Sequence, residues 1–400
     1  MKNKVFNNIL GGSFLLLITI NIFFVLNYFF HFAMARMLPI EEYGILVTLY
    51  SIIYILAVFT ESIQLVISRY TTEKNDGEIK NLIKKSSSKS LKISFYLFLV
   101  YLVIAYPLSI ILKIGYPLVA LTGTIIFSSF LLPITRGVLQ GKKRFGSLGF
   151  NMISEAVVKL SSAVFLVMVG WMIYGAIVAT LLGTYFSLLI SFVSLKDIFK
   201  GEEIKSKNPG IYAYSAPVFV AIIAVIVFYS IDVIIAKIFF SAEMAGYYAV
   251  ASMIAKVIFF GTQPISKAMF PIASESKNGE KKKKVFKYAL LLLGGLIIIG
   301  LLIVYLLPGL LINIFSGKDI PQITNILILP AIATSIISLT NLNILYKLSQ
   351  GRVKGCFYLP IFIVIEVVLM SVFSSSIASF SLAFVISSII FFLGSIILHR

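Results

Sequence analysis

Long apolar runs separated by short polar turns repeat along the whole 400-residue chain. Each run is about 20 residues long, which is enough for an α-helix to cross roughly 30 Å of hydrocarbon. The runs lack the strict alternation of apolar and polar residues that a membrane β-strand requires. The pattern therefore predicts twelve transmembrane helices, at residues 9–35, 44–67, 93–112, 118–135, 147–169, 174–193, 212–239, 246–270, 288–307, 324–345, 356–373 and 380–398.

The second half of the chain repeats the first. The matched positions are Tyr28 and Tyr229, His31 and Asp232, Arg36 and Lys237, Gln140 and Gln350, and Glu155 and Glu366. These landmarks occur in the same order in both halves, and a repeat this long indicates two equivalent bundles rather than a solenoid. We expect two six-helix bundles in parallel orientation, residues 1–200 and 208–400, joined by a linker at the Asn208-Pro209-Gly210 breaker.

The amino-acid composition is typical of an integral membrane protein. Hydrophobic residues make up 59% of the chain and charged residues 12%, and the mean hydropathy is +1.02. The net charge of +18 does not indicate a nucleic-acid partner, because most of the 34 Lys and Arg lie in loops on the side that holds both termini. By the positive-inside rule, that side is cytoplasmic. The single cysteine, Cys356, excludes an internal disulfide.

Three motifs resemble those of polysaccharide flippases. They are Ala-Arg-x-Leu-Pro-x-Glu-Glu-Tyr-Gly from Ala35, then Asp232 followed by Ala-Lys-x-Phe and Ala-Gly-Tyr-Tyr, and Gln-Gly after the fourth and tenth helices. These flippases belong to the multidrug/oligosaccharidyl-lipid/polysaccharide exporter superfamily. The resemblance implies a central cavity between two bundles in the plasma (inner) membrane of a prokaryote. It also implies transfer of an undecaprenyl-diphosphate-linked oligosaccharide to the outer leaflet for surface polysaccharide synthesis.

The helix count refines this expectation. Relatives that flip the peptidoglycan precursor commonly carry fourteen helices, so twelve favour the O-antigen or capsule branch. Two rigid bundles can rock about a site near the midplane, as alternating access requires. The main alternative is an ion-coupled multidrug or cation exporter of the same superfamily. A membrane glycan polymerase or ligase is less favoured, because the longest outer segment, 308–323, carries only Lys318 and Asp319 as charges.

These considerations define the expected partners. We expect a lipid-linked oligosaccharide substrate, membrane lipids, an H⁺ or Na⁺ counter-ion and a polysaccharide polymerase, and we expect no nucleic acid. The chain has no nucleotide-binding loop, so energy must come from an ion gradient or from consumption of the product. We expect no enzymatic activity, no cofactor, and no catalytic or metal-binding residues.

Charged residues within the predicted helices are the candidate site, because each is costly to place in hydrocarbon. Glu155, Lys159, Lys256 and Glu366 lie nearest the midplane. Glu155 and Lys159 are four residues apart and can pair on one helix face, either as a structural pair or as part of the cavity lining. Glu366 has methionine, not lysine, four residues on, and is expected to be protonated or hydrogen-bonded across helices.

Three basic residues are candidates for binding the diphosphate. Lys256 has no carboxylate three or four residues away on its helix, so we expect it to be the principal phosphate contact, shared with Lys159 across the cavity. The competing interpretation is a structural bridge from Lys256 to Glu366 or Asp232. Arg136, near an inner helix end, either receives phosphate as substrate enters or is simply interfacial.

Glu155 and Glu366, together with His31 and Asp232, are the candidates for coupling or gating. His31 and Asp232 form a repeat-related pair. The repeat places them at equivalent depth, about one turn from the outer ends of the first and seventh helices. A carboxylate facing an imidazole would shift the pKa of the histidine, so the pair would form a proton-sensitive latch. The alternative is that each makes a local hydrogen bond at the membrane interface.

Overall fold

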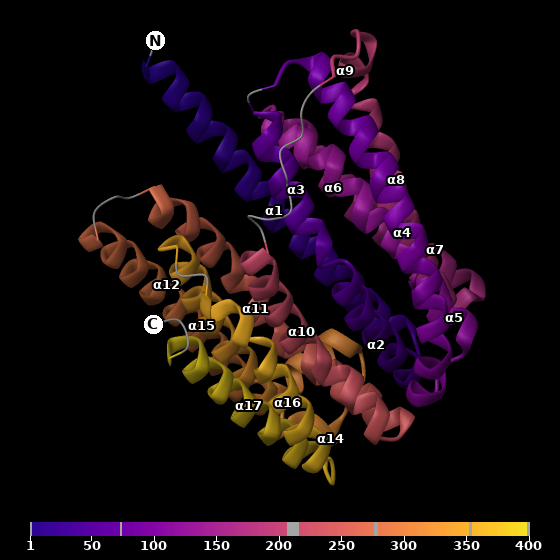
Figure 1. Cartoon of the computed structure of the whole chain (residues 1–400). Helices are drawn as coiled ribbons and strands as arrows, with labels where there is room; N and C mark the ends of the chain where they lie inside the picture. Colours follow the sequence, from indigo (N-terminus) through magenta and orange to yellow (C-terminus); the bar gives the residue numbers. More distant parts are fainter. Residues whose placement is uncertain (1, 73, 206–215, 276–278, 352–353, 398–400) are drawn as a thin grey trace. The chain divides into compact units, whose positions relative to one another are not determined.

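A computed structural model of the protein describes residues 2–72, 74–205, 216–275, 279–351 and 354–397, and these are almost entirely helical (Figure 1). Eleven segments within these ranges are long and apolar enough to cross a membrane. The predicted class, an all-helical multi-pass membrane protein, is therefore confirmed. One of the segments, Phe145–Val193, is 49 residues long and contains two helices that pack against each other.

Close contacts divide the chain into two compact units. Unit 1 comprises Met1–Met34 and Leu56–Ser215, and unit 2 comprises Ala35–Ile55 and Ala216–Arg400. The last boundary, before Ala216, lies near the expected linker at Asn208-Pro209-Gly210, which is outside the described ranges. The grouping differs from the division expected from the sequence in one segment, because Ala35–Ile55 packs with the second half of the chain.

Unit 1 is built from most of the helices of the first half. They are α1 (Lys2–Met37), α3 (Phe59–Thr71), α4 (Asp76–Leu112), α5 (Tyr116–Thr122), α6 (Ile125–Gly141), α7 (Phe145–Leu166), the π-helical turn η1 (Val167–Trp171), α8 (Met172–Val193) and α9 (Lys196–Lys200). Gly170 adopts a φ of +94° between α7 and α8, a conformation that glycine enters without steric cost. The chain turns at this point, so that α7 and α8 form a hairpin.

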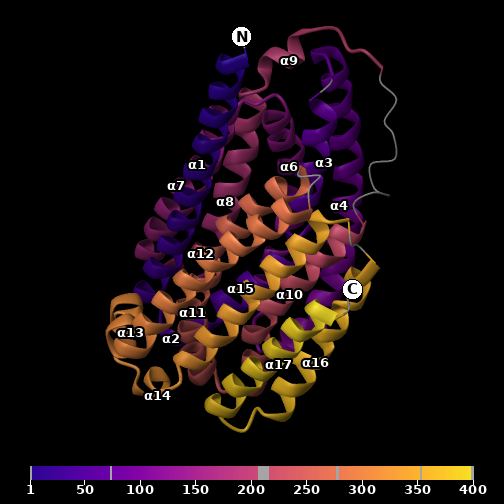
Figure 2. The ribbon, with the colours of Figure 1, turned by 90° about the vertical axis from the view of Figure 1, so that its left-hand side faces the viewer.

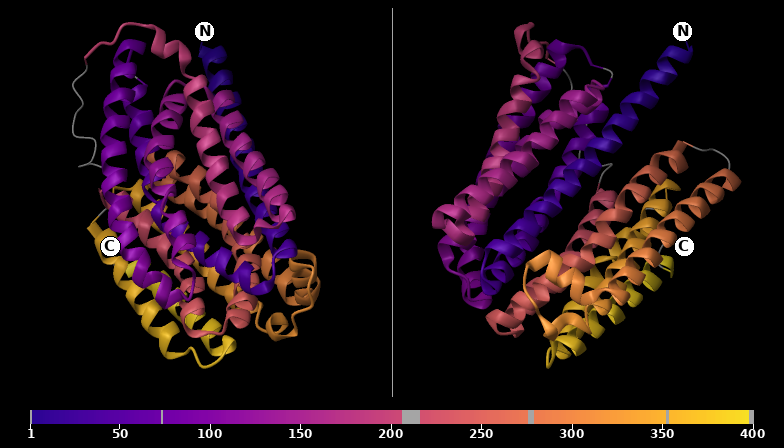
Figure 3. Two further views of the ribbon diagram at one scale, coloured as in Figure 1. Left: turned by 90° about the vertical axis from the view of Figure 1, so that its right-hand side faces the viewer. Right: turned by 180° about the vertical axis from the view of Figure 1, so that it is seen from behind.

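Unit 2 combines α2 with the helices of the second half. They are α2 (Ile40–Leu56), α10 (Ala216–Phe239), α11 (Ala242–Glu275), α12 (Gly279–Leu306), α13 (Pro308–Ser316), α14 (Pro321–Thr324), α15 (Ile328–Ser349), the 3₁₀ turn η2 (Lys354–Tyr358), α16 (Pro360–Val372) and α17 (Ile377–Ile397). The short helices α13 and α14 lie together at one end of this unit, drawn in orange in Figure 2. Helix α17 packs against both α15 and α16, and the yellow C-terminal helices lie side by side in Figure 3.

Two predicted helices are interrupted. The run at 44–67 divides into α2 and α3 around Ala57, and the run at 118–135 divides into α5 and α6 at Gly123. A Cβ atom on Gly123 would lie 2.2 Å from the ring of Tyr101, so the break lies in close contact with α4. Hydropathy reports only the polarity of a run, which is why the apolar pattern did not reveal these breaks.

The polar segment 68–92, between the second and third predicted helices, is mostly helical. Helix α4 begins at Asp76 and runs for 37 residues. A capping box starts it, because the Glu78 amide donates to the Asn75 side chain over 2.9 Å and the Asn75 amide donates to Glu78 over 3.3 Å. The basic residues of this segment therefore lie on the first turns of α4, and the same helix continues into the apolar run.

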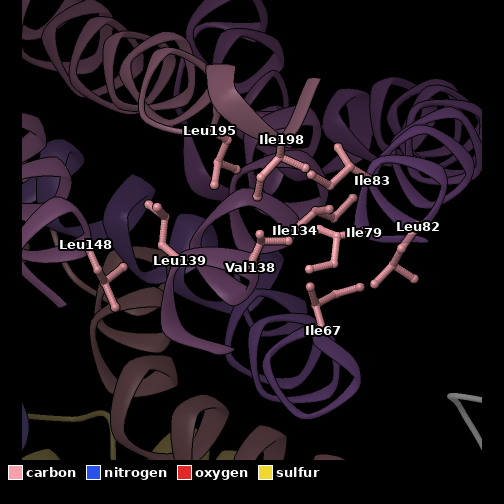
Figure 4. Packing of buried hydrophobic residues seen from close by; sticks show 10 residues of the cluster. All are labelled: Ile67, Ile79, Leu82, Ile83, Ile134, Val138, Leu139, Leu148, Leu195 and Ile198. Atoms are coloured by element: carbon pink, nitrogen blue, oxygen red, sulfur yellow. The ribbon is translucent and has the colours of Figure 1, made fainter. Parts of the chain in front are cut away.

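A buried apolar cluster joins the helix ends at the basic end of unit 1 (Figure 4). Its ten members are Ile67, Ile79, Leu82, Ile83, Ile134, Val138, Leu139, Leu148, Leu195 and Ile198. They come from α3, α4, α6, α7, α9 and the turn before α9, so the cluster holds the short helix α9 against the bundle. The Arg144 guanidinium bonds both carboxylate oxygens of Asp197 and holds the pKa of that carboxyl at about 2, below its usual value.

Polar side chains join the helices of unit 2. Thr262 on α11 donates to Ser338 on α15 over 2.9 Å, and Lys347 on α15 donates to the carbonyl groups of Ser395 and Ile396 on α17. Such hydrogen bonds hold helices together where lipid removes the hydrophobic driving force between them. The ring of Phe228 on α10 stacks on Phe391 of α17 at a centroid distance of 4.4 Å.

Candidate functional site

Unit 1 contains a buried cluster centred on Arg136. Its guanidinium donates to Glu155 on α7 over 2.5 Å, to Asn151 on α7 over 2.7 Å and to Ser187 on α8 over 2.9 Å. Arg136, Asn151 and Ser187 are all buried. We call these four residues the Arg136 cluster. Charge-assisted hydrogen bonds from three directions compensate for removing the guanidinium from water.

Lys159 lies one turn beyond Glu155 on α7 and has different neighbours. Its ammonium group donates to the side-chain amide of Asn27 on α1 and lies 4.6 Å from the centroid of the Phe30 ring. Only 6% of the lysine is exposed. A neutral amide and an aromatic face solvate the ammonium while leaving its charge in place.

Unit 2 contains a second ionic cluster. The Lys256 ammonium on α11 lies 2.9 Å from a carboxylate oxygen of Asp232 on α10, and both residues are buried. Ser252 and Tyr248, also on α11, donate to the other carboxylate oxygen over 2.6 and 3.2 Å. Tyr248, Ser252 and Lys256 are spaced by four residues, so one face of α11 encloses Asp232. We call these four residues the Asp232 cluster.

Glu366 lies near the Asp232 cluster but takes no part in its hydrogen bonds. The residue is on α16 and is 0% exposed, and within the described part of the chain neither carboxylate oxygen has a hydrogen-bond partner. The charges of Asp232 and Lys256 act on it. Because Lys256 already neutralises Asp232, an ionised Glu366 would add an uncompensated buried negative charge.

Spacing on α7 allows Glu155 to pair with Lys159, and the charge of Glu155 acts on Lys159. The ion pair of Glu155 is with Arg136 on another helix, and Lys159 donates to Asn27. Intrahelical spacing alone cannot decide this, because a guanidinium from a neighbouring helix competes for the same carboxylate. Arg136, expected near solvent at an inner helix end, is buried, with an exposed fraction of 6%.

The other candidates divide between the two units. Lys256 bridges to Asp232, which is the competing interpretation of the sequence, and both belong to unit 2 together with Glu366. His31 is buried on α1 in unit 1, with its ring 5.3 Å from that of Phe30. The pairing of His31 with Asp232, and the sharing of phosphate by Lys159 and Lys256, would join different units and stay predictions.

Several residues of these clusters were not singled out from the sequence. They are Asn27, Asn151, Ser187, Tyr248 and Ser252. A signal was present, since Asn151, Glu155 and Lys159 are four apart, as are Tyr248, Ser252 and Lys256. A stripe of polar residues at this spacing on an otherwise apolar helix indicates a face turned toward other protein groups rather than lipid.

Solved structures with the same fold are membrane transporters. An inward-facing multidrug resistance MATE family transporter of the MOP superfamily superposes with a TM-score of 0.72 at 14% identity, over 92% of this chain and 93% of that one. The lipid II flippase MurJ, in an inward closed conformation, gives 0.71 at 16% identity, over 97% and 87%. A MOP superfamily transporter from Pyrococcus furiosus gives 0.67 at 14% identity, over 96% and 94%. The helical architecture therefore defines a multi-pass membrane protein with the MOP fold.

The sequence assigns the family. A family profile described as "Polysaccharide biosynthesis protein" matches residues 9–277, and the chain belongs to this family. An uncharacterized membrane protein of Methanocaldococcus jannaschii is 25% identical over 276 residues, which is 63% of this chain and 64% of that relative. The match thus spans less than two-thirds of the relative's length.

Proposed function

We propose that this protein flips a lipid-linked oligosaccharide of the undecaprenyl-diphosphate type from the inner to the outer leaflet of a prokaryotic plasma membrane, for surface polysaccharide synthesis. The observation that carries the proposal is membership of the polysaccharide biosynthesis family over residues 9–277. The MOP fold, which the lipid II flippase MurJ also has, supports a transporter rather than an enzyme. Alternating access between the two halves is the proposed mechanism.

The proposed topology has twelve crossings with both termini in the cytoplasm. Eleven candidate segments become twelve crossings when the hairpin of α7 and α8 is counted as two. Basic residues gather at the ends of helices that then face the cytoplasm, as the positive-inside rule requires. The proposed bundles correspond to residues 1–200 and 208–400, with Ala35–Ile55 held by the second half in this conformation.

Buried cations are the proposed contacts for the diphosphate. Lys159 is one of them, and its buried ammonium group donates to the neutral side-chain amide of Asn27. Arg136 and Lys256 each bind a carboxylate, so a phosphate must displace or share Glu155 or Asp232. A diphosphate can do so without leaving the cations uncompensated. Lys256, expected from the sequence as the principal contact, stays a proposed contact and also takes part in coupling.

Glu366 and Asp232 are the proposed coupling residues. When a phosphate takes Lys256 from Asp232, two buried carboxylates remain without a cation, and the region must take up H⁺ or Na⁺. We favour H⁺, because Glu366 already lies buried without a hydrogen-bond donor among the described residues. The expected test is Glu366→Gln, which mimics the protonated acid and should remove the pH dependence of transport in proteoliposomes. An unchanged pH profile in this variant would exclude Glu366 from coupling.

The latch between His31 and Asp232 stays a prediction. Asp232 already accepts three hydrogen bonds within unit 2, so pairing with His31 would require a conformation in which Lys256, Ser252 or Tyr248 has moved. Asp232→Asn should then change both transport and its pH dependence. If neither changes, the latch is wrong.

The function itself is tested by deletion and reconstitution. Cells without the protein should lose surface glycan and keep their drug tolerance, and purified protein in proteoliposomes should move a polyprenyl-diphosphate-linked oligosaccharide between leaflets. Drug sensitivity with intact surface glycan would instead identify a multidrug or cation exporter. Loss of glycan chain length with flipping intact would indicate a polymerase or ligase.

Substitutions that remove or keep the charge of Lys159 distinguish a role in phosphate binding from a role in helix packing. Lys159→Ala should abolish flipping and Lys159→Arg should restore part of it, if positive charge at this depth binds phosphate. The matched control is Lys113→Ala, since Lys113 is an exposed lysine in the turn after α4. Full flipping by Lys159→Ala at equal expression would exclude Lys159 as a phosphate contact.

A further inference from the structure

Two cations fasten the first hairpin to the segment between α12 and α15. The Arg36 guanidinium donates to the Ile314 carbonyl over 3.0 and 2.6 Å. The Lys318 ammonium donates to the carbonyl groups of Ala35 and Leu38 over 2.9 and 2.8 Å. All of these residues belong to unit 2. We call Arg36, Lys318 and their acceptors the clasp.

Arg36 on α1 caps the end of α13, the helix that precedes Lys318. Lys318 in turn caps the end of α1. Ile314 lies in the last turn of α13, and Ala35 and Leu38 lie at the end of α1. Carbonyl groups in a final helical turn lack intrahelical donors and form the negative end of the helix dipole. The clasp satisfies these acceptors at two helix ends at once. Because both donors are long, flexible side chains, the contacts can also be exchanged for water.

The backbones beside the clasp are in direct contact. A Cβ atom on Gly44 would lie 2.8 Å from the Cα atom of Gly246, and one on Gly246 would lie 2.3 Å from the carbonyl oxygen of Ile40. The ring of Tyr43 meets that of Phe315 at a centroid distance of 6.2 Å. The first turns of α2 and α11 therefore leave no passage between them while the clasp is closed.

We propose that Arg36 and Lys318 form a latch that holds residues 35–55 against the rest of unit 2 and opens once in each transport cycle. The inference rests on the proposed function, because a glycan head group can leave only if the paired hairpins at the outer end separate. By the repeat, the start of α2 corresponds to the start of α11, so opening would separate two equivalent segments of unit 2. The latch supplies contacts that are specific to the closed conformation.

Reversible cross-linking tests the opening. In a Cys356→Ser background, the double variant Arg36→Cys/Lys318→Cys is linked by a flexible bis-methanethiosulfonate reagent and later reduced. Flipping of a polyprenyl-diphosphate-linked oligosaccharide should stop on linking and return on reduction. The control is Asn313→Cys/Lys318→Cys, which links two positions on the same side of the clasp and should leave flipping unchanged. Full flipping by the linked Arg36→Cys/Lys318→Cys variant would overturn the latch.

A labelling assay tests the latch without substrate. Ala35→Cys places a thiol at a position that is 0% exposed beneath Lys318. Adding Lys318→Ala should speed its reaction with a membrane-impermeant maleimide by at least about tenfold, since two charge-assisted hydrogen bonds are lost. Lys318→Arg should keep the reaction slow, and Lys113→Ala should not affect it. An unchanged rate in Lys318→Ala would overturn the latch even if the protein transports a different substrate.

The two assays separate the two proposals. If unlinked protein moves no lipid-linked oligosaccharide, the proposed function fails and the labelling rates still decide the latch. If flipping occurs and linking leaves it intact, the function stands and the latch fails.

Discussion

At the residue scale, two buried cations form ion pairs with carboxylates on other helices. Arg136 on α6 binds Glu155 on α7, and Lys256 on α11 binds Asp232 on α10. Ion pairs of this kind contribute little net stability when intact, but removing one partner strands the other in a medium of low dielectric constant. Single substitutions in a pair should therefore be much more harmful than the matched double substitution.

The Arg136 cluster provides this test. Arg136→Gln should lower the free energy of unfolding by about 3 kcal/mol, the low end for a buried pair, because the half-buried Glu155 would lose its cation. The double variant Arg136→Gln/Glu155→Gln should recover at least half of that loss. Thermal unfolding in detergent, with Lys113→Ala as an exposed control, measures the difference. Equal destabilisation by the single and double variants would contradict the pairing.

At the element scale, glycines set how closely helices approach. A Cβ atom on Gly137 of α6 would lie 2.7 Å from the Cβ atom of Ile67 on α3, and one on Gly141 would lie 2.4 Å from the Ser68 carbonyl oxygen. Small residues at helix crossings permit the close contacts on which helix association in lipid depends. The α3–α6 crossing should thus be more sensitive to an added methyl group than a helix position with open space around its glycine.

Alanine at two glycines tests this crossing. Gly137→Ala should destabilise the protein by about 1–3 kcal/mol through overpacking, despite the better helix propensity of alanine. Gly146→Ala on α7 should be neutral or slightly stabilising, because nothing lies within 4 Å of the position that the new methyl group would take. Unfolding temperatures of the two variants, measured in the same detergent, provide the comparison. A Gly137→Ala variant as stable as Gly146→Ala would contradict the packing described for α3 and α6.

The ion pair between Arg144 and Asp197 helps to hold α9 against the bundle. The pKa of Asp197 sets the pH range in which this pair is intact. Arg144 lowers that pKa from 3.8 to about 2, so the pair stabilises the folded state at pH values above the unfolded pKa. This contribution is lost only as the pH falls through about 2. Hydrogen exchange at Leu195 and Ile198, corrected for intrinsic rates, should therefore be constant from pH 7 to pH 4. Asp197→Asn should accelerate it throughout that range, whereas a rise near pH 4 in the unaltered protein would contradict the pair.

At the scale of the whole molecule, close contacts divide the chain into two compact units. Unit 2 includes residues 35–55 from the first half, so contact and sequence divide the chain differently at this one hairpin. The reason is physical, since the carbonyl groups at the end of α1 are capped by Lys318 and the start of α2 contacts the start of α11. Orientation in the membrane follows from the distribution of basic residues.

Tags placed along the chain test the topology. Tags at either terminus should be accessible only from the cytoplasm, and a tag at Glu41 or Glu243 only from outside. The reason is that twelve crossings return the chain to the side on which it began. Accessibility is measured by protease protection in oriented vesicles, with a tag at Lys281 as a cytoplasmic control. Termini on opposite sides would contradict both the twelve crossings and the parallel repeat.

The sequence by itself determined the class of the protein, its helical segments, its repeat and its family resemblance. Those properties depend on local composition, because about 20 apolar residues must form a helix in hydrocarbon wherever the helix lies. It also identified Arg136, Glu155, Lys159, Asp232, Lys256 and Glu366 as exceptional, since a charge within such a helix is costly in any fold.

Only the tertiary structure decided which of these residues meet. The partner of a buried charge depends on the rotation and depth of a neighbouring helix, and neither is encoded in the spacing along one helix. The tertiary structure therefore paired Glu155 with Arg136, enclosed Asp232 with Tyr248 and Ser252, and left Glu366 beside that cluster. For the same reason the clasp could not be foreseen, because Arg36 and Lys318 are far apart in the chain and meet only through the packing of unit 2.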